Sequence, residues 1–142
     1  PLAHALGLTF LPHSSLPAFI SGASANDLSL HVRAGTSSVD TLLPLKTIAD
    51  KCVWHPRELT AYCATPQTKP SANFLDSYYR GEVHTSDAWW KVNAQDGTVE
   101  LLLPTGNATI DVERPVIDAA GTSIAFTNAI DKSLWYVKIP QE

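Results

Sequence analysis

The sequence predicts an all-β fold, and three observations support this prediction. Short segments rich in β-branched and aromatic residues occur along most of the 142-residue chain, as is typical of strands. Clusters of Gly, Pro, Asn, Asp and Ser, which favour turns, separate these segments. The best helix candidate, residues 41–51, carries Pro44, which would remove a helix hydrogen bond and clash with the preceding turn.

The strands follow one another in chain order with turn signals between them. With 44% hydrophobic residues, the chain is long enough for one sizeable core. Asp96-Gly97 is interpreted as a hairpin turn and not as part of a calcium loop, because oxygen ligands are missing at the alternate positions. The clearest predicted strands cover residues 28–32, 52–54, 60–64, 88–92, 99–103, 123–127 and 133–139.

A repeat becomes visible when the sequence is aligned with itself. "TFLPHSSLPAFI" (residues 9–20) aligns with "CVWHPRELTAYC" (52–63) at an offset of 43, and a further offset of 63 reaches "RPVIDAAGTSIAF" (114–126). Each copy continues into an aromatic-rich strand and a closing strand. The recurring columns are Leu11, Trp54 and Ile117; Leu30, Trp90 and Trp135; and Val32, Val92 and Val137.

A four-stranded unit of roughly 40 residues is typical of a β-propeller blade. We therefore predict that residues 1–142 form a single propeller segment of about three four-stranded antiparallel blades, over approximately 7–45, 46–104 and 108–140. A β-sandwich or barrel of three unrelated meanders is the alternative. Because a propeller closes with about four to eight blades, we expect a partial propeller or one completed by association, and no stable isolated monomer.

Three stretches carry a resemblance to a known type of protein. They are "LPLKTIADKCVWHPRELTAYCATP", "DSYYRGEVHTSDAWWKVNAQDGTVELLL" and "GTSIAFTNAIDKSLWYVKI". Over residues 42–139 the chain resembles uncharacterised bacterial β-propeller repeat proteins of the WD40-like, TolB-like and candidate-phylum type. It departs from their turn pattern at residues 55–58, where His-Pro-Arg-Glu replaces Ser and Asp-Gly. The resemblance implies a fold and an exported location, and no activity.

Both cysteines lie in "KCVWHPRELTAYC", which we interpret as two strands joined by a turn at Arg57 and Glu58. This register places Cys52 opposite Cys63, where directly opposed residues are close enough for a disulfide. Two reduced, buried thiols are the alternative. A metal site is disfavoured, because two cysteines cannot complete a structural zinc site and the Cys-x-x-Cys spacing is absent.

Composition and motifs argue against several functions. The net charge of −4 and the lack of a basic stripe disfavour nucleic acid. No apolar run approaches the roughly 18 residues of a membrane helix. No motif of a catalytic nucleophile, phosphate loop or dinucleotide site occurs, and the five histidines are scattered and interpreted as surface residues. We therefore assign no catalytic residue, cofactor or metal.

The segment 68–84, an insertion in the second repeat, is the least repeat-like part of the chain. Phe74, Tyr78, Tyr79 and Arg80 are of types enriched at interface anchors, so they form a candidate binding surface. The alternative is that the insertion folds back as a cap over its own blade.

Two further residues are candidates of other kinds. Trp89 is turned by alternation to the sheet face opposite Trp90, so it is either a stacking residue or, as blades pack on both faces, part of the core. Asn107 begins an "NAT" glycosylation sequon in a predicted loop.

The function expected from these observations is a non-enzymatic binding or assembly module. It acts at the cell surface, in the periplasm or outside the cell, with a protein partner or a second copy. The alternatives are the propeller domain of a larger exported hydrolase and a structural subunit of a surface layer or filament. Because the chain starts at Pro1 and lacks methionine, we expect a processed chain or a piece of a longer one.

Overall fold

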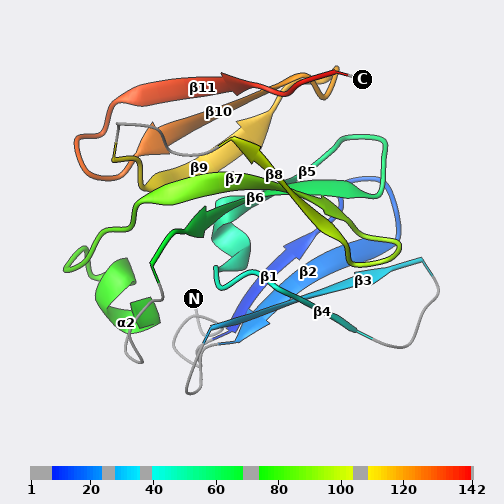
Figure 1. Cartoon of the computed structure of the whole chain (residues 1–142), viewed down its shortest axis with the longest axis horizontal. Coiled ribbons are helices and arrows are strands. Elements are labelled where there is room, and N and C mark those ends of the chain that lie inside the picture. The colour runs from blue at the N-terminus through cyan, green and yellow to red at the C-terminus, as the bar shows by residue number, and fades with distance from the viewer. Residues whose placement is uncertain (1–7, 24–27, 36–39, 69–73, 104–108, 142) are drawn as a thin grey trace.

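The computed structural model describes residues 8–23, 28–35, 40–68, 74–103 and 109–141, and these form an all-β fold of three antiparallel sheets (Figure 1). The first sheet contains β1 (Leu8–Pro12), β2 (Ala18–Ala23), β3 (Ser29–Ala34) and β4 (Thr41–Leu43). The second contains β5 (Cys52–Trp54), β6 (Thr60–Pro66), β7 (Asp87–Asn93) and β8 (Val99–Leu103). The third contains β9 (Val112–Ile117), β10 (Ser123–Asn128) and β11 (Leu134–Lys138).

Each sheet is a meander in which every strand pairs with the next strand of the chain. Figure 1 shows the sheets lying over one another in chain order, with the second in the middle. Four-stranded antiparallel units were predicted, and two of the sheets have them. The third has three strands within the described residues, and none of the three sheets closes on itself.

The core is divided into two main layers, one on each side of the middle sheet. Between the first and second sheets lie Ile20, Leu30, Val32, Trp54, Cys63 and Val92 with their neighbours. Between the second and third sheets lie Tyr62, Ala64, Trp89, Val112, Ile124 and Phe126. The middle sheet is therefore buried on both faces, and five of the seven residues of its strand β6 are buried.

The first hairpin of each sheet is closed by the same hydrogen-bonding device. The backbone N–H of His13, of His55 and of Asp118 donates to the carbonyl five residues ahead. In each turn the side chain of that residue also accepts backbone N–H groups: His55 Nδ1, for example, accepts from Arg57 and Glu58. A polar side chain at the start of the turn thus accepts backbone N–H groups of that turn in all three sheets.

The first of these turns also contacts the second, and the second contacts the third. The hydroxyl of Ser15 donates to the carbonyl of Pro56 at 3.0 Å, and the guanidinium of Arg57 donates to the carbonyl of Ala119 at 2.6 Å. Gly121 has a positive φ of 74°, and a Cβ there would lie 2.2 Å from the His55 ring. Only glycine therefore fits the third turn against the second.

The turns correct the predicted alignment of the first repeat. His13 and His55 are 42 residues apart, not 43, whereas Asp118 follows His55 by the predicted 63. A slip of one residue exchanges the two faces of a strand. The predicted alignment of Leu30 with Trp90 is therefore wrong by one residue, and the counterpart of Leu30 is Trp89. Leu30 and Trp90 instead pack into the layer between the first and second sheets, each from its own sheet.

The helical segments are short. Pro44 follows β4, and only the 3₁₀ turn η1 (Ala49–Lys51) forms in the segment that was the best helix candidate. The helix α2 (Phe74–Tyr79) lies in the insertion, where no helix was predicted.

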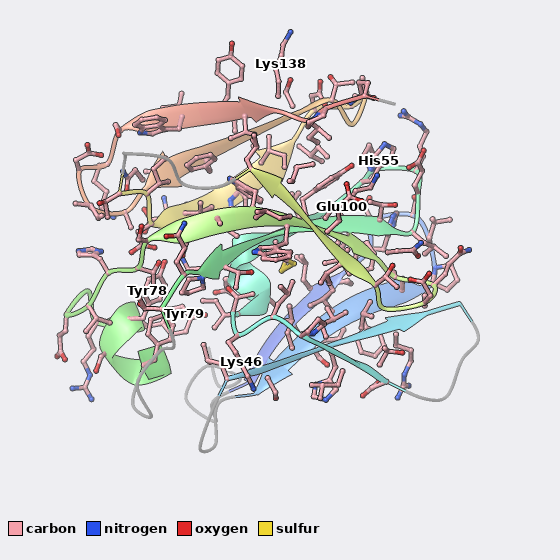
Figure 2. All side chains as sticks on the ribbon, in the orientation of Figure 1. Lys46, His55, Tyr78, Tyr79, Glu100 and Lys138 are labelled. Atoms are coloured by element: carbon pink, nitrogen blue, oxygen red, sulfur yellow. A yellow bond between two sulfur atoms is a disulfide. The ribbon has the colours of Figure 1, made fainter. Side chains whose placement is uncertain are left out.

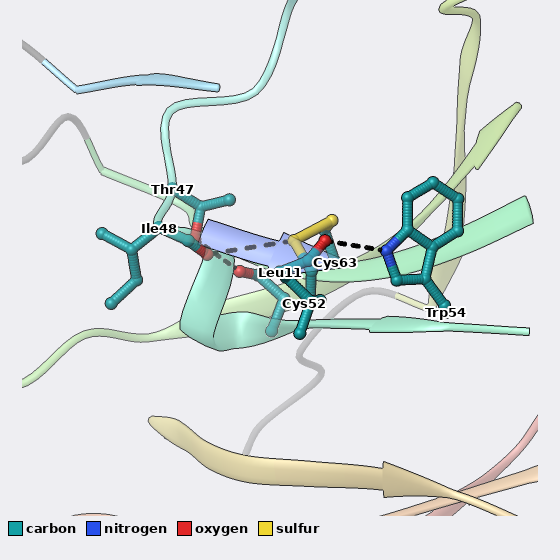
Figure 3. The surroundings of a disulfide bond; sticks show 7 residues. Leu11, Thr47, Ile48, Cys52, Trp54 and Cys63 are labelled. Atoms are coloured by element: carbon teal, nitrogen blue, oxygen red, sulfur yellow. Dashed lines mark hydrogen bonds between the residues drawn. A yellow bond between two sulfur atoms is a disulfide. The ribbon is translucent and has the colours of Figure 1, made fainter. Parts of the chain in front are cut away.

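The predicted cysteine hairpin is confirmed. Cys52 pairs with Cys63 and Trp54 with Ala61, and a disulfide joins the two cysteines, whose Cα atoms are 4.0 Å apart. Figure 3 shows the bridge beside Trp54, whose indole N–H donates to the carbonyl of Leu11 at 3.1 Å. The bridged hairpin is thereby tied to the first sheet.

We predict that titration of the denatured, unreduced protein detects close to zero free thiols per chain. Replacing both cysteines with alanine should lower the free energy of unfolding by about 2–3 kcal/mol, because the closed loop is short. Urea unfolding of the oxidised protein and of the Cys52→Ala/Cys63→Ala variant measures the difference. Two titratable thiols in the untreated protein would contradict the bridge.

Candidate functional site

A cavity of about 630 Å³ opens where the first strands of the three sheets come together. Leu11 of β1, Cys52 of β5 and residues 112–115 of β9 contribute to its lining. The insertion contributes residues 78–81, 83 and 84. The cavity is therefore lined both by the first strands of the three sheets and by the insertion.

A buried lysine lies beside this cavity. The side chain of Lys51 is 1% exposed, and its ammonium donates to Asp87 Oδ2 at 2.7 Å, to Asp111 Oδ1 at 2.6 Å and to the carbonyl of Val112 at 2.9 Å. Its Nζ lies 4.9 Å from the ring centroid of Tyr78. All three donors of the ammonium are therefore used.

Asp111 collects further hydrogen bonds. The Tyr78 hydroxyl donates to Oδ1 at 2.9 Å and the Thr85 hydroxyl to the same oxygen at 3.1 Å. His84 Nδ1 lies 3.0 Å from Oδ2. The carboxylate is completely buried, and these contacts supply the partners that a buried charge needs.

The three charged residues come from different elements and connect two sheets. Lys51 ends η1 directly before β5, Asp87 begins β7, and Asp111 directly precedes β9. Asp87 Oδ2 also accepts the backbone N–H of Val112 at 2.9 Å. The Lys51–Asp87–Asp111 cluster thus joins the second sheet to the third.

The two carboxylates respond differently to the same lysine. Burial raises the pKa of Asp87 above its ordinary value, and the opposing effects of Lys51 and of hydrogen bonds do not overcome it. Burial also acts to raise the pKa of Asp111, but Lys51, His84 and Tyr78 together hold it below its ordinary value. Burial, and then the charge of Asp111, raises the pKa of Tyr78. Asp111 is therefore the carboxylate held most firmly in its charged form.

The residues singled out in the insertion have several roles. Phe74 is buried against Ile48 and Leu28, and its ring lies 5.2 Å from that of Tyr78. Tyr79 is 39% exposed, and its hydroxyl donates to Asp50 at 2.5 Å. The insertion is thus anchored as a cap by Phe74 and Tyr78. Tyr78, Tyr79 and Arg80 line the cavity. Figure 2 shows the two tyrosines close together beside the helix α2.

The other candidates lie elsewhere. Trp89 is 4% exposed and packs in the layer between the second and third sheets, with its ring 5.8 Å from that of Phe126. Its buried ring offers no surface for a ligand, and the predicted alternation with Trp90 is confirmed. Asn107 lies outside the described residues.

Sequence reasoning missed the cluster itself. Lys51, Asp87 and Asp111 were not singled out, and His84 was interpreted as a surface residue although it contacts Asp111. The available signal was a charged residue directly before β5 and β9 and at the first position of β7. The described residues hold no group of three or more His, Cys, Asp or Glu side chains that could bind a metal.

Comparison with known proteins adds no relative. No protein-family model matches the chain, and no curated protein matches it significantly.

We predict that Asp111→Asn lowers the free energy of unfolding by about 3 kcal/mol at pH 7, because it leaves Lys51 with one buried carboxylate fewer. The pKa of Asp111 is lowered on folding, so its contribution is present above the ordinary carboxyl pKa of 3.8 and is lost as the pH falls through the folded value. The difference between the wild type and the variant should therefore shrink in acid.

Urea unfolding at a series of pH values measures this difference. Glu113→Gln is the matched control, because Glu113 pairs with the exposed Lys132 at 3.0 Å and should change stability by less than about 1 kcal/mol. If both substitutions changed the free energy of unfolding equally at every pH, Asp111 would not be the charged, buried partner of Lys51.

Proposed function

We propose that the chain is a β-propeller segment and that it acts as a non-enzymatic binding or assembly module. The observation that carries this proposal is the difference between the inner and outer faces of the sheets. Both faces of the middle sheet are covered, whereas the first and third sheets each leave one face open with large apolar side chains on it. Uncovered apolar faces of this kind mark an interface.

The open face of the third sheet carries Val116, Leu134 and Tyr136, which are 61%, 80% and 68% exposed. Tyr136 and Val116 both pair with Ala125, whereas the neighbouring Ile124 points the other way, into the core. By the alignment of the turns, Ala125 is the counterpart of Tyr62, which is buried in the middle sheet. The open face of the third sheet thus corresponds to the face of the second sheet that the third sheet covers.

The open face of the first sheet carries Phe10 and Leu42, which are 58% and 62% exposed. The ring of Phe10 lies 5.0 Å from the ring of Phe19. The guanidinium of Arg33 lies 5.4 Å from the centroid of the Phe19 ring. This face corresponds to the side of the middle sheet that carries the disulfide and Trp54. The open face of the first sheet therefore corresponds to the face of the second sheet that the first sheet covers.

The arrangement of the first strands supports the propeller. The most extensive backbone contacts between sheets join η1 or β5 to β1, β2 and β9. Blades of a propeller come together at their first strands around a central channel. The stacked turns and the consecutive meanders support the same arrangement.

The occupant that we propose for the open faces is a second copy of the chain. One copy's third sheet covers the other copy's first sheet, as consecutive sheets do within one chain, and two such contacts close a six-sheet ring. Further blades of the same polypeptide would cover the faces in the same way. A location outside the cytoplasm is supported by the disulfide. No helix in the described part of the chain is long and apolar enough to cross a membrane.

We predict that the chain sediments at equilibrium as a dimer at micromolar concentration, and that Phe10→Asp and Tyr136→Asp each give a monomer. Because each variant keeps the face that the other has lost, an equimolar mixture should recover a dimer held by one interface. Ile130→Asp is the control, since Ile130 is 44% exposed but lies in the turn between β10 and β11, away from both faces.

A sharply melting monomer of 15.4 kDa would contradict assembly through these faces and favour a self-contained fold. Dimers that persist in both variants would place the interface elsewhere on the molecule.

A further inference from the structure

Arg114, at the edge of the cavity, has an unusual backbone conformation. Its φ is +53°, in the left-handed region that disfavours residues with a side chain. The next residue is Pro115, which normally restricts the preceding residue to extended conformations. The chain therefore keeps an arginine at a position where glycine would be less strained.

The strain coincides with a β-bulge. Glu113 pairs with Thr127 and Val116 pairs with Ala125, so Arg114 and Pro115 together lie opposite the single residue Phe126. Bulges redirect a side chain and are frequent beside functional sites. Here the redirected residue lines the cavity.

The guanidinium of Arg114 makes no hydrogen bond or ion pair with the part of the chain that the structure describes. The carboxylates nearby are already engaged: Asp50 accepts from Tyr79, Asp111 from Lys51, and Glu113 from Lys132 at 3.0 Å. Arg114 is thus a cation lining the cavity that makes no ion pair with these acids. A guanidinium binds a carboxylate or a phosphate through two parallel hydrogen bonds.

The remaining lining indicates the rest of the ligand. Leu11 and Val83 are apolar, and Tyr79 presents part of its ring. His84 is held by Asp111, and its side chain is 42% exposed. The surroundings of Arg114 thus combine an apolar wall with an oriented imidazole.

We propose that this cavity binds a small molecule with an oxyanion group, carboxylate or phosphate, on an apolar body, and that Arg114 holds the oxyanion. The backbone strain is retained because a glycine would relieve it but remove the guanidinium. This binding site goes beyond the assembly function. It contains none of the exposed apolar residues of the open sheet faces, so the two proposals can fail independently.

The test uses the full chain with phenyl phosphate, benzoate and inorganic phosphate, each followed by isothermal titration calorimetry at low ionic strength. We expect saturable binding of phenyl phosphate or benzoate, and weaker binding of inorganic phosphate. Arg114→Gly should weaken binding by about tenfold or more, the contribution of hydrogen bonds to a charged group. Its melting temperature should be unchanged or higher, because glycine accepts the left-handed backbone.

Two further variants keep the proposal open to contradiction. Arg114→Lys keeps the charge but loses the planar pair of donors, so its affinity should be lower than that of the wild type, and this comparison stands even if the glycine variant fails to fold. Lys138→Gln is the control, because Lys138 is an exposed cation of β11 that does not line the cavity, so the affinity should change by less than about twofold.

The choice between phenyl phosphate and benzoate identifies the oxyanion. Inorganic phosphate binding as tightly as phenyl phosphate would overturn the apolar part of the proposal. Equal affinities of the wild type, Arg114→Gly and Arg114→Lys, or no binding of any probe at millimolar concentration, would overturn all of it.

Discussion

The contact on which the rest of the structure depends is the buried ammonium of Lys51 between Asp87 and Asp111. A buried ion pair adds little net stability compared with apolar residues of similar size, but losing one partner leaves an uncompensated charge in the core. Two sheets can bury Lys51 only if they meet in one arrangement, because its acceptors come from the start of β7 and the segment before β9. The cluster therefore specifies how the second sheet meets the third, as well as holding them together.

The same cluster connects the scaffold to the insertion. Tyr78 reaches Asp111 from α2, and His84 reaches it from the segment after the helix. A change in the charge of Asp111 would consequently be felt both by the interface between the sheets and by the cavity that the insertion helps to line. The proposed ligand site and the packing of the sheets thus share a structural basis, although different residues make the proposed contacts.

Much of the fold could be predicted from the sequence because its signals are local. Alternating strands, turn residues and the opposed cysteines each follow from neighbours along the chain, and the disulfide register agrees with them. The first repeat was misaligned by one residue because a short hydrophobic strand allows two registers, and only the hydrogen bonds of His13 and His55 choose between them. The candidate site was less predictable, since Lys51 and Asp111 are 60 residues apart and neither belongs to a recognised motif.

The sequence by itself determined the all-β class, the order of the meanders and the cysteine hairpin, because the side-chain alternation and turn chemistry that specify them act over a few residues. The tertiary structure decided which tryptophan of the pair faces which layer and that the insertion anchors itself through Phe74 and Tyr78. It also decided that Arg114 is redirected by a bulge into a cavity. These features depend on which distant segments share a core, and burial and charge pairing between sheets settle that choice only when the chain has folded.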